Sequence, residues 1–287
     1  MKVLVLGGSG MLGHAAYRTF AAAPGIKAFA TLRGEAARRH FPAGLQNGFV
    51  TGVDVLDTDA LAAAIARVRP DVVVNAVGLV KQLGNAKDPL AALPINALFP
   101  HRLARLCALA GARVIHVSTD CVFLGDRGNY TEADRPDADD LYGRSKLLGE
   151  VDEPHAVTLR TSIIGRELGS RHGLVDWFLG ETGSVRGFTR AVFSGLTTDE
   201  LSRVMLRHVL PNPGLRGVWH VSVAPVTKHD LLVLLRDAYG RDTRIEADDR
   251  LVLDRSLDST RFRQATGWVP LEWPDMIATM RDQEWFA

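Results

Sequence analysis

Cysteine is scarce in this sequence: the 287 residues include only Cys107 and Cys121. Two cysteines are too few to stabilise a chain of this length by disulfide bonds, which excludes a disulfide-rich scaffold. The sequence has no run of about 18 apolar residues, so an ordinary membrane-spanning helix is not predicted. The first residues also lack the long apolar stretch and the small-residue cleavage site of a signal peptide, and we expect a cytoplasmic protein.

The chain has little net charge, because 34 Lys and Arg residues stand against 33 Asp and Glu residues. A net charge of +1 gives no electrostatic reason for nucleic acid or an anionic membrane to be the main partner. The nine histidines show neither HxH nor HExxH spacing, so no metal site is predicted. With 46% hydrophobic and 23% charged residues, the composition is typical of one large globular domain or two closely joined ones.

Short apolar runs alternate with helical patterns over the first 165 residues. The runs that indicate strands lie at 3–6, 26–32, 49–53, 71–75, 113–118 and 156–160. Helices are predicted at 11–23, 57–68, 95–110 and 141–151. Strands that are apolar along most of their length and alternate with helices are typical of a parallel sheet covered on both faces. We therefore predict a doubly wound α/β fold.

The second half of the chain is less regular. Its helical patterns lie at 198–210, 227–239 and 273–286, and strands are predicted at 217–221 and 243–246. Because the strand–helix alternation is lost, we expect a smaller α/β lobe after about residue 165.

A glycine-rich turn follows the first predicted strand. Gly7, Gly10 and Gly13 have GxxGxxG spacing, and a predicted helix begins directly behind them. Glycine allows a tight turn and the close approach of a pyrophosphate, while the helix N-terminus offers amide groups and the positive end of a dipole. An ordinary strand–helix turn would also explain the glycines. The strand before and the helix after favour a dinucleotide site.

The end of the second predicted strand bears on which dinucleotide binds. NAD sites usually place a carboxylate there, on a ribose hydroxyl. Residues 30–33 read Ala-Thr-Leu-Arg instead. Arg33 could form a bidentate pair with a ribose phosphate, which favours NADP(H) over NAD(H). The alternative is that Arg33 is a solvated loop residue.

A second group of polar residues has the pattern of an acid–base site. Thr119 follows the predicted strand at 113–118, and Tyr142 and Lys146 are four positions apart on one face of a predicted helix. A neighbouring ammonium lowers the pKa of a phenol from its usual value of about 10, so that tyrosine can act as a general acid or base. A threonine hydroxyl can orient a substrate carbonyl. A YxxxK pair alone is common on surface helices, but its order behind a glycine turn and a strand-terminal Ser-Thr favours a catalytic site.

Together these motifs resemble the extended short-chain dehydrogenase/reductase superfamily. Within it, the chain is similar to the dTDP-4-dehydrorhamnose reductase family, whose members are NADPH-dependent reductases of keto sugar nucleotides. The resemblance rests on the glycine turn, RPDVVVNA at 69–76, STDCVF at 118–123 and YGRSKLLGE at 142–150. It covers most of residues 1–165 and is thinner from 166 to 287.

The resemblance implies a Rossmann-like α/β fold with a smaller α/β substrate lobe. The NADP-binding domain would comprise residues 1–165 and about 192–221, and the substrate lobe about 166–191 and 222–287. Relatives of this kind commonly pair through helices that correspond here to 95–110 and 141–151. A homodimer is therefore expected to bury Leu103, Leu106 or Leu147.

The resemblance also implies the residues of the site. The catalytic set would be Thr119, Tyr142 and Lys146. Cofactor contacts are expected at Gly7, Ser9, Gly10, Met11, Leu12, Gly13, Arg33, Asp54, Val55, Asn75, Ala76, Val77, Tyr142 and Lys146. Substrate contacts are expected at Thr119, Asp120, Cys121, Arg186, Arg190 and Arg255, the arginines facing a nucleotide diphosphate.

The function implied is NADPH-dependent reduction of the keto group of a dTDP- or UDP-linked 4-keto-6-deoxy sugar, in deoxysugar or polysaccharide biosynthesis. The chain departs from the family's usual residues at 77–82, 163–167 and 187–195, where the sugar would lie, so the sugar stays open. Two alternatives also stay open. One is an NAD-dependent sugar-nucleotide epimerase or dehydratase, although Asp120-Cys121 is not the Asp-Glu pair of a dehydratase. The other is a non-catalytic NADP-binding regulatory subunit.

Overall fold

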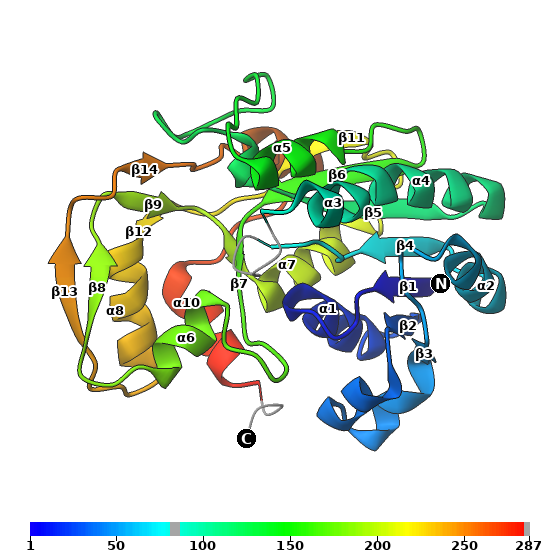
Figure 1. The fold of residues 1–287 in the computed structure, drawn as a ribbon, viewed down its shortest axis with the longest axis horizontal. Helices are drawn as coiled ribbons and strands as arrows, with labels where there is room; N and C mark the ends of the chain where they lie inside the picture. The colour runs from blue at the N-terminus through cyan, green and yellow to red at the C-terminus, as the bar shows by residue number, and fades with distance from the viewer. Residues whose placement is uncertain (81–86, 284–287) are drawn as a thin grey trace.

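The protein is built around one seven-stranded sheet in which every neighbouring pair of strands is parallel (Figure 1). The computed structural model describes residues 1–80 and 87–283. The strand order is β11-β6-β5-β4-β1-β2-β3. The predicted Rossmann-like α/β fold is confirmed. The strands are β1 (Lys2–Leu6), β2 (Lys27–Leu32), β3 (Phe49–Thr51), β4 (Val72–Asn75), β5 (Arg113–Thr119), β6 (Ala156–Thr161) and β11 (Gly217–His220).

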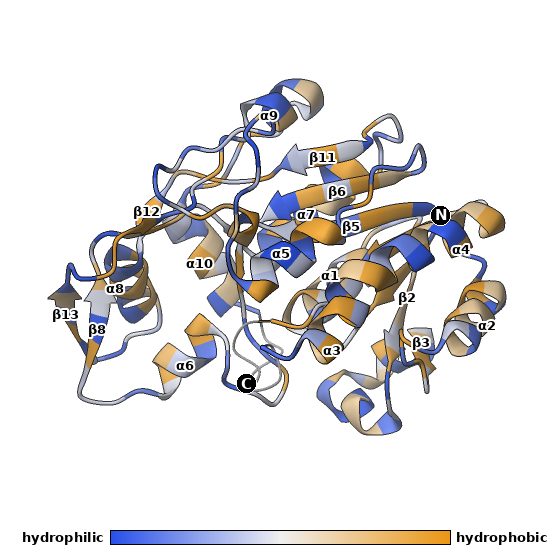
Figure 2. Cartoon of the chain, turned by 45° about the horizontal axis from the view of Figure 1, so that its top comes forward, coloured by the Kyte–Doolittle hydropathy of each residue, from blue (hydrophilic) through white to orange (hydrophobic). Residues whose placement is uncertain are grey.

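Helices cover both faces of this sheet. Alternate residues of each strand point to opposite sides, so Val3 and Val5 pack with α1 (Met11–Ala21) and α7 (Thr198–Val204). Leu4 and Leu6 pack on the other side with α2 (Thr58–Val68) and α4 (Phe99–Ala110). Burial on both faces explains why the strands are apolar throughout. Figure 2 shows this hydrophobic character along β5 and on α1.

Capping residues set several helix boundaries. Asp57 precedes α2 and accepts hydrogen bonds from the backbone amides of Asp59 and Ala60, both at 3.0 Å. Gly111 ends α4 with a φ of 68°, a left-handed conformation that suits glycine. These local signals are why the predicted start of α2 and the predicted end of α4 lie close to the observed ones.

Two helices predicted near the centre of the chain differ from the observed ones. The segment predicted at 95–110 consists of α3 (Pro89–Ala92), a wider π-helical stretch at Leu93–Leu98, and α4. The helix predicted at 141–151 ends early, as α5 (Leu141–Leu148). At the next residue, Gly149, a side chain would overlap the carbonyl oxygen of Asn96, so the chain passes this point only as glycine. Tertiary contact therefore decides the path of the chain after α5.

The second half forms three small sheets. β7 (Ile163–Ile164) pairs with β10 (Leu196–Thr197), and β8 (Ser184–Phe188) pairs with β13 (Arg244–Asp248). β9 (Ala191–Phe193) lies between β12 (Val226–Thr227) and β14 (Leu253–Asp254). The remaining helices are α6 (Leu174–Gly180), α8 (Lys228–Ala238), α9 (Thr260–Thr266) and α10 (Trp273–Arg281). Residues 284–286 of the predicted C-terminal helix lie outside the described residues.

The second half is not separated from the main sheet by a break in the core. One buried cluster includes Phe20 of α1, Leu201 of α7, Leu232 of α8 and Ile277 of α10. The sheet of β8 and β13 lies with α8 at the end of the molecule opposite β2 and β3 (Figure 1). The proposed boundaries of the two lobes stay a prediction.

Of the leucines predicted at a dimer interface, Leu103 is fully buried within its own chain, against the sheet. It is therefore not available to a partner copy. Leu106 and Leu147 are partly buried against the chain's own clusters. Leu98 and Leu148 are exposed beside them, with exposed fractions of 51% and 62%. Pairing through this face stays a prediction for Leu106 and Leu147.

Candidate functional site

The glycine turn between β1 and α1 is held tightly against its surroundings. Gly7 has a φ of 81°, and its amide donates to Thr31 Oγ1 at 3.1 Å. A side chain at Gly13 would overlap the carbonyl oxygen of Gly7, and a Cβ at Gly8 would lie 2.7 Å from the Cβ of Ala30. Gly10 begins α1 without a side-chain cap. The turn therefore presents glycine backbone and helix amides, which is the arrangement that binds a pyrophosphate.

Residues that follow β4 lie against this turn. A Cβ at Gly7 would come within 2.9 Å of Val77 Cγ2. Asn75 is buried, and its Oδ1 accepts a hydrogen bond from the Val77 amide at 3.1 Å. Its Nδ2 donates to Nδ1 of His116 at 3.1 Å. Burial lowers the pKa of His116 well below its ordinary value, so this histidine is a neutral acceptor. The structure thus brings Asn75, Ala76 and Val77 beside the predicted cofactor turn.

The other predicted cofactor residues in the first half occupy exposed turns. Arg33 follows β2 and is exposed. Asp54 is also exposed, and its Oδ1 accepts from the Leu56 amide at 2.9 Å. Val55 packs against the core. A carboxylate does follow β2, at Glu35, but it accepts from Thr51 Oγ1 at 2.5 Å and pairs with Arg38 at 2.6 Å. Arg33 is thus an exposed cation at the strand end, while the nearby Glu35 carboxylate is engaged by Thr51 and Arg38.

Thr119 lies at the carboxyl end of β5, where the chain turns sharply. Its Oγ1 accepts a hydrogen bond from the Cys121 amide at 3.2 Å and donates one to Asp120 Oδ1 at 3.2 Å. Because β5, β4 and β1 are adjacent and parallel, this end of β5 lies at the same sheet edge as the glycine turn. Ligands of open α/β sheets bind at that edge.

Tyr142 and Lys146 lie one helical turn apart in α5, which Asp140 caps by accepting from the Gly143 amide at 2.7 Å. Burial raises the pKa of Tyr142 above its usual range, and the nearby Cys121, Asp120 and Asp140 act in the same direction. A hydrogen bond with the side chain of Thr119 opposes this rise in the pKa. Thr119 and Tyr142 are therefore brought together, as the sequence predicted.

Lys146 differs from one expectation. Its Nζ donates to the Val117 carbonyl oxygen at 2.8 Å, and burial lowers the pKa of Lys146 to about 8, against the effect of Glu150. We expected Lys146 to lower the pKa of Tyr142, but the pKa of Tyr142 is raised in this structure. The physical reason is that burial disfavours both charged forms, and the ammonium is held by a backbone carbonyl.

Several buried polar contacts near Thr119, Tyr142 and Lys146 were not predicted from the sequence. Glu150 and Arg160 form a bidentate pair, with Nε–Oε1 and Nη2–Oε2 both at 2.7 Å. Ser118 Oγ also donates to Glu150 Oε1, at 2.8 Å. Asn96 accepts from the Leu79 amide at 2.8 Å and donates to Ser145 Oγ at 3.2 Å. Glu150 belongs to the YGRSKLLGE motif, and that motif is the sequence signal that could have identified it.

Side chains from the second half reach the turn after β5. Arg255 Nε donates to the Phe123 carbonyl oxygen at 2.8 Å, and its Nη1 lies 3.6 Å from Cys121 Sγ. Lys228 begins α8, and its Nζ lies 4.0 Å from the centre of the Phe193 ring. The charges of Lys228 and Arg255 both act on Asp120. Arg255 thus lies beside Cys121, another predicted substrate residue, and its contact with a substrate stays a prediction. Lys228 was not among the predicted residues.

The other two predicted substrate arginines lie elsewhere. Arg186 is exposed on β8 and pairs with Asp248 of β13 at 3.8 Å. Arg190 is exposed in the turn between β8 and β9. Neither is joined to Thr119, Tyr142 or Lys146 by a hydrogen bond or ion pair recorded within the described residues. Their role toward a substrate stays a prediction.

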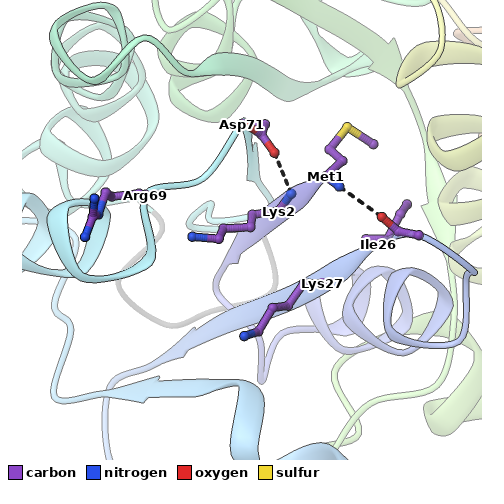
Figure 3. Close-up of a pocket in the computed structure, with 7 residues that line it drawn as sticks. Met1, Lys2, Ile26, Lys27, Arg69 and Asp71 are labelled. Carbon is purple, nitrogen blue, oxygen red and sulfur yellow. Dashed lines mark hydrogen bonds between the residues drawn. The ribbon is translucent and has the colours of Figure 1, made fainter.

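A hollow at the opposite edge of the main sheet does not coincide with this site. It is lined by Met1, Lys2, Gly25, Ile26, Lys27, Arg69 and Asp71 (Figure 3). The terminal amine of Met1 donates to the Gly25 carbonyl oxygen at 2.9 Å, and the Lys2 amide donates to Asp71 Oδ2 at 2.6 Å. This hollow lies at the amino ends of β1 and β2, away from the edge where α/β sheets bind ligands.

Comparison with known proteins finds a matching family model and several relatives. The family model described as RmlD substrate binding domain matches residues 1–183. A dTDP-4-dehydrorhamnose reductase from Mycobacterium tuberculosis is 36% identical over 148 residues, which cover 44% of this chain and 49% of that protein. The match thus spans about half the length of that relative.

Two further relatives match over more of the chain. A probable low-salt glycan biosynthesis reductase from Haloferax volcanii is 31% identical over 216 residues, or 71% of each chain. Methionine adenosyltransferase 2 subunit beta from Danio rerio is 29% identical over 253 residues, which cover 83% of this chain and 74% of that protein.

A solved structure shares the whole fold. The dTDP-4-dehydrorhamnose reductase from Bacillus anthracis, solved in complex with NADP, has a TM-score of 0.77 at 18% identity and covers 99% of both chains. Over the part of our chain that is described, no helix combines the length and apolarity needed to cross a bilayer.

Proposed function

Because the chain belongs to the RmlD substrate binding domain family, we propose that it is an NADP(H)-dependent oxidoreductase that reduces the keto group of a nucleotide-activated sugar. The observation that carries the proposal is the juxtaposition at one sheet edge of the glycine turn with Thr119, Tyr142 and Lys146. The reductases among the relatives support the same reaction class.

The residues present fit a dinucleotide. The turn at Gly7, Gly10 and Gly13 is a cradle that a Cβ would fill, and no side chain caps α1. With Ser9, Met11 and Leu12 it would hold the pyrophosphate. Asn75, Ala76 and Val77 would line the cofactor, and Asp54 and Val55 would flank its adenine. Arg33 would pair with the ribose phosphate, and the complex of the Bacillus anthracis protein with NADP supports that choice.

When bound, NADPH supplies a hydride to the carbonyl carbon of the substrate. Tyr142 donates a proton to the oxygen of the same carbonyl. Its raised pKa keeps the phenol protonated, which suits a proton donor. Thr119 orients the carbonyl, and Lys146 holds the ribose next to the nicotinamide. Asp120, Cys121 and Arg255 lie around the sugar, while Arg186 and Arg190 are candidates for the diphosphate.

The finer proposal concerns the substrate, which would be a dTDP- or UDP-linked 4-keto-6-deoxy sugar. The test is incubation of the purified protein with NADPH and a panel of keto sugar nucleotides, followed by identification of the product. Oxidation of NADPH that depends on one of these sugars supports the proposal. Turnover without added NADPH, by protein that carries tightly bound NAD(H), would indicate an epimerase or dehydratase instead.

A second candidate function is that of a subunit of a larger enzyme. The match to methionine adenosyltransferase 2 subunit beta over 83% of this chain favours it. Retention of Thr119, Tyr142 and Lys146 argues against a chain that only binds NADP. Stoichiometric recovery of one enzyme with the tagged protein, together with no NADPH oxidation on any sugar of the panel, would support the second candidate.

A further inference from the structure

Two cations of the second half follow the outer strands of the small sheet formed by β12, β9 and β14 (Figure 1). Lys228 comes directly after β12, and Arg255 comes directly after β14. Thr227 and Asp254, the last residues of these strands, pair with Val192 of β9 from its two sides. Neighbouring strands lie about 5 Å apart, so these two positions are about 10 Å apart. Two long side chains can reach one ligand from that separation.

Both side chains are directed to one face of this sheet. Lys228 Nζ lies 4.0 Å from the centre of the Phe193 ring. The register of β14 with β9 places Leu253 on the same face as Phe193. A Cβ at Gly125 would lie 2.6 Å from Leu253 Cδ1 and 2.7 Å from Arg255 Cγ, so these two side chains lie together. Gly125 belongs to the segment that follows β5, and this face of the sheet is therefore turned toward that segment.

Arg255 reaches the turn that begins at Thr119. Its Nε donates to the Phe123 carbonyl oxygen at 2.8 Å, and its Nη1 lies 3.6 Å from Cys121 Sγ. The Cys121 amide donates in turn to Thr119 Oγ1 at 3.2 Å. Within the described residues, Arg255 Nη2 has no hydrogen-bond partner. The guanidinium is therefore fixed near the hydroxyl that is proposed to orient the substrate carbonyl, and it has donor hydrogens left for a ligand.

The ammonium of Lys228 lies over a ring but has no acceptor. Over residues 1–80 and 87–283 it donates no hydrogen bond and forms no ion pair. Burial lowers the pKa of Lys228 to about 8, while Asp120 and Cys121 raise that pKa, so the ammonium is charged at neutral pH. A charged group withdrawn from water is costly unless acceptors meet its donor hydrogens. An oxyanion bound beside Phe193 would supply those acceptors.

The charges around these two side chains favour an anionic ligand. Asp120 is the carboxylate whose charge acts on Lys228, and it is buried. In the described part of the chain it forms an ion pair with neither Lys228 nor Arg255. Burial raises the pKa of Asp120, although both cations act against this rise. Two cations therefore face one carboxylate, which leaves positive charge for a ligand to balance.

We propose that Lys228 and Arg255 form a subsite for an oxyanion of the substrate, in which Lys228 is a specificity-determining residue. The oxyanion is a carboxylate on the sugar or the phosphate attached to the sugar, because Arg255 is fixed at the turn that begins at Thr119. Oxygens of both groups are bound by Arg and Lys side chains. This inference rests on the proposed reduction of a sugar nucleotide, but its test measures binding alone.

The test is isothermal titration calorimetry on protein saturated with NADP⁺, so that the glycine turn is not available to the probes. The probes are UDP, UDP-glucose and UDP-glucuronate, together with their dTDP counterparts. Lys228→Met should weaken binding about 10- to 100-fold, which corresponds to the loss of one charge-assisted hydrogen bond. An equal loss for all probes identifies a phosphate as the oxyanion, and a loss confined to the glucuronates identifies a sugar carboxylate. Unchanged affinity for every probe, or no binding of any probe, would overturn the subsite.

Further variants separate a binding role from a structural one. Lys228→Arg keeps the charge and should retain most of the affinity, while Lys228→Gln takes the place of Lys228→Met if the latter does not fold. Lys27→Met is a matched control, since Lys27 also lies over a phenylalanine ring, 5.6 Å from the centre of Phe29, on β2. It should leave every affinity unchanged. Equal losses in Lys228→Met and Lys27→Met would contradict the assigned role of Lys228.

The outcome of this test is separable from that of the proposed function. Lack of NADPH oxidation with every sugar of the panel, combined with an affinity that depends on Lys228, would refute the reductase and keep the subsite. Reductase activity with the same KM in Lys228→Met as in the wild type, combined with unchanged affinities, would refute only the subsite.

Discussion

Two buried carboxylates flank the end of β5, and the protein stabilises them differently. Glu150 accepts two hydrogen bonds from Arg160 at 2.7 Å and one from Ser118 at 2.8 Å. Asp120 accepts a hydrogen bond from Thr119 at 3.2 Å, while the two cations that act on it, Arg255 and Lys228, contact other groups. Glu150 is thus held by direct bidentate pairing with its cation, whereas Arg255 and Lys228 act on Asp120 through their charges.

The two sites also differ in where their partners come from. Glu150, Arg160 and Ser118 all belong to the first part of the chain, on or beside β5 and β6. The cations around Asp120 arrive with α8 and β14 of the second half. The Glu150–Arg160 pair is therefore formed within the first part of the chain. The charges near Asp120 depend on how the second half packs against the carboxyl end of β5. The predictions below test this division.

The largest expected effect is on turnover, for variants of the residues at the carboxyl end of β5. Tyr142→Phe removes the hydroxyl and leaves the ring to pack, so the fold and NADPH binding should persist. General acid catalysis contributes on the order of 10²–10⁴-fold, and kcat should fall by about that factor. Thr119→Val should cost less, because it loses an orienting hydroxyl and no proton donor. Steady-state kinetics on the identified sugar nucleotide measures both. Near-full activity of Tyr142→Phe would place the proton donor elsewhere, with Asp120 the next residue to examine.

For the Glu150–Arg160 pair, we expect a loss of folding stability. Arg160→Met leaves Glu150 buried without its cation, and breaking such a pair costs about 3–5 kcal/mol. The side chains of Arg160 and Glu150 are both only 7% exposed, so solvent screening is small. Urea unfolding followed by circular dichroism gives the free energy of unfolding. The double variant Arg160→Met/Glu150→Gln should recover part of the loss, and additive losses in that variant would show that the pair is not coupled.

The cofactor end of the site should show a smaller effect, on binding. Arg33→Ala should narrow the preference for NADPH over NADH by about 1.5–3 kcal/mol, which is the size of a hydrogen bond to a charged group. Isothermal titration calorimetry of both cofactors measures it. Arg39→Ala is a matched control, being an arginine of the same segment with a recorded contact to His40. A wild-type protein that prefers NADH would contradict the assignment of Arg33.

The smallest effect concerns pH. Burial lowers the pKa of Lys146 to about 8, so its ammonium is present below that pH and is lost as the pH rises through it. NADPH affinity should therefore weaken modestly above pH 8 in the wild type. In Lys146→Met the affinity should be lower and flat over this range. Fluorescence titration of NADPH at several pH values provides the measurement, and a flat wild-type profile would show that Lys146 does not contribute its charge to binding.

Much of the first half could be predicted because its signals are local. Asp57 caps its own helix, Gly111 adopts a positive φ at the end of α4, and the apolar runs mark strands buried on both faces. The order of the motifs also predicted that Thr119 and Tyr142 act at one site. Thr119 ends β5, Tyr142 lies in α5, and a hydrogen bond joins their side chains. In contrast, the early end of α5 depends on the close packing of Gly149 against the Asn96 carbonyl oxygen. No sequence pattern within the helix predicts that contact.

The sequence by itself determined the parallel sheet, the glycine turn and the types of residue at the site, because backbone conformation and the period of burial are set by near neighbours. The tertiary structure alone decided the charge around the reacting groups. It paired Glu150 with Arg160, bound Lys146 to the Val117 carbonyl oxygen, and brought Lys228 and Arg255 close enough to act on Asp120. The reason is physical: the pKa of a buried group depends on burial and on charges a few ångströms away in space, and the chain delivers those charges from segments far apart in sequence.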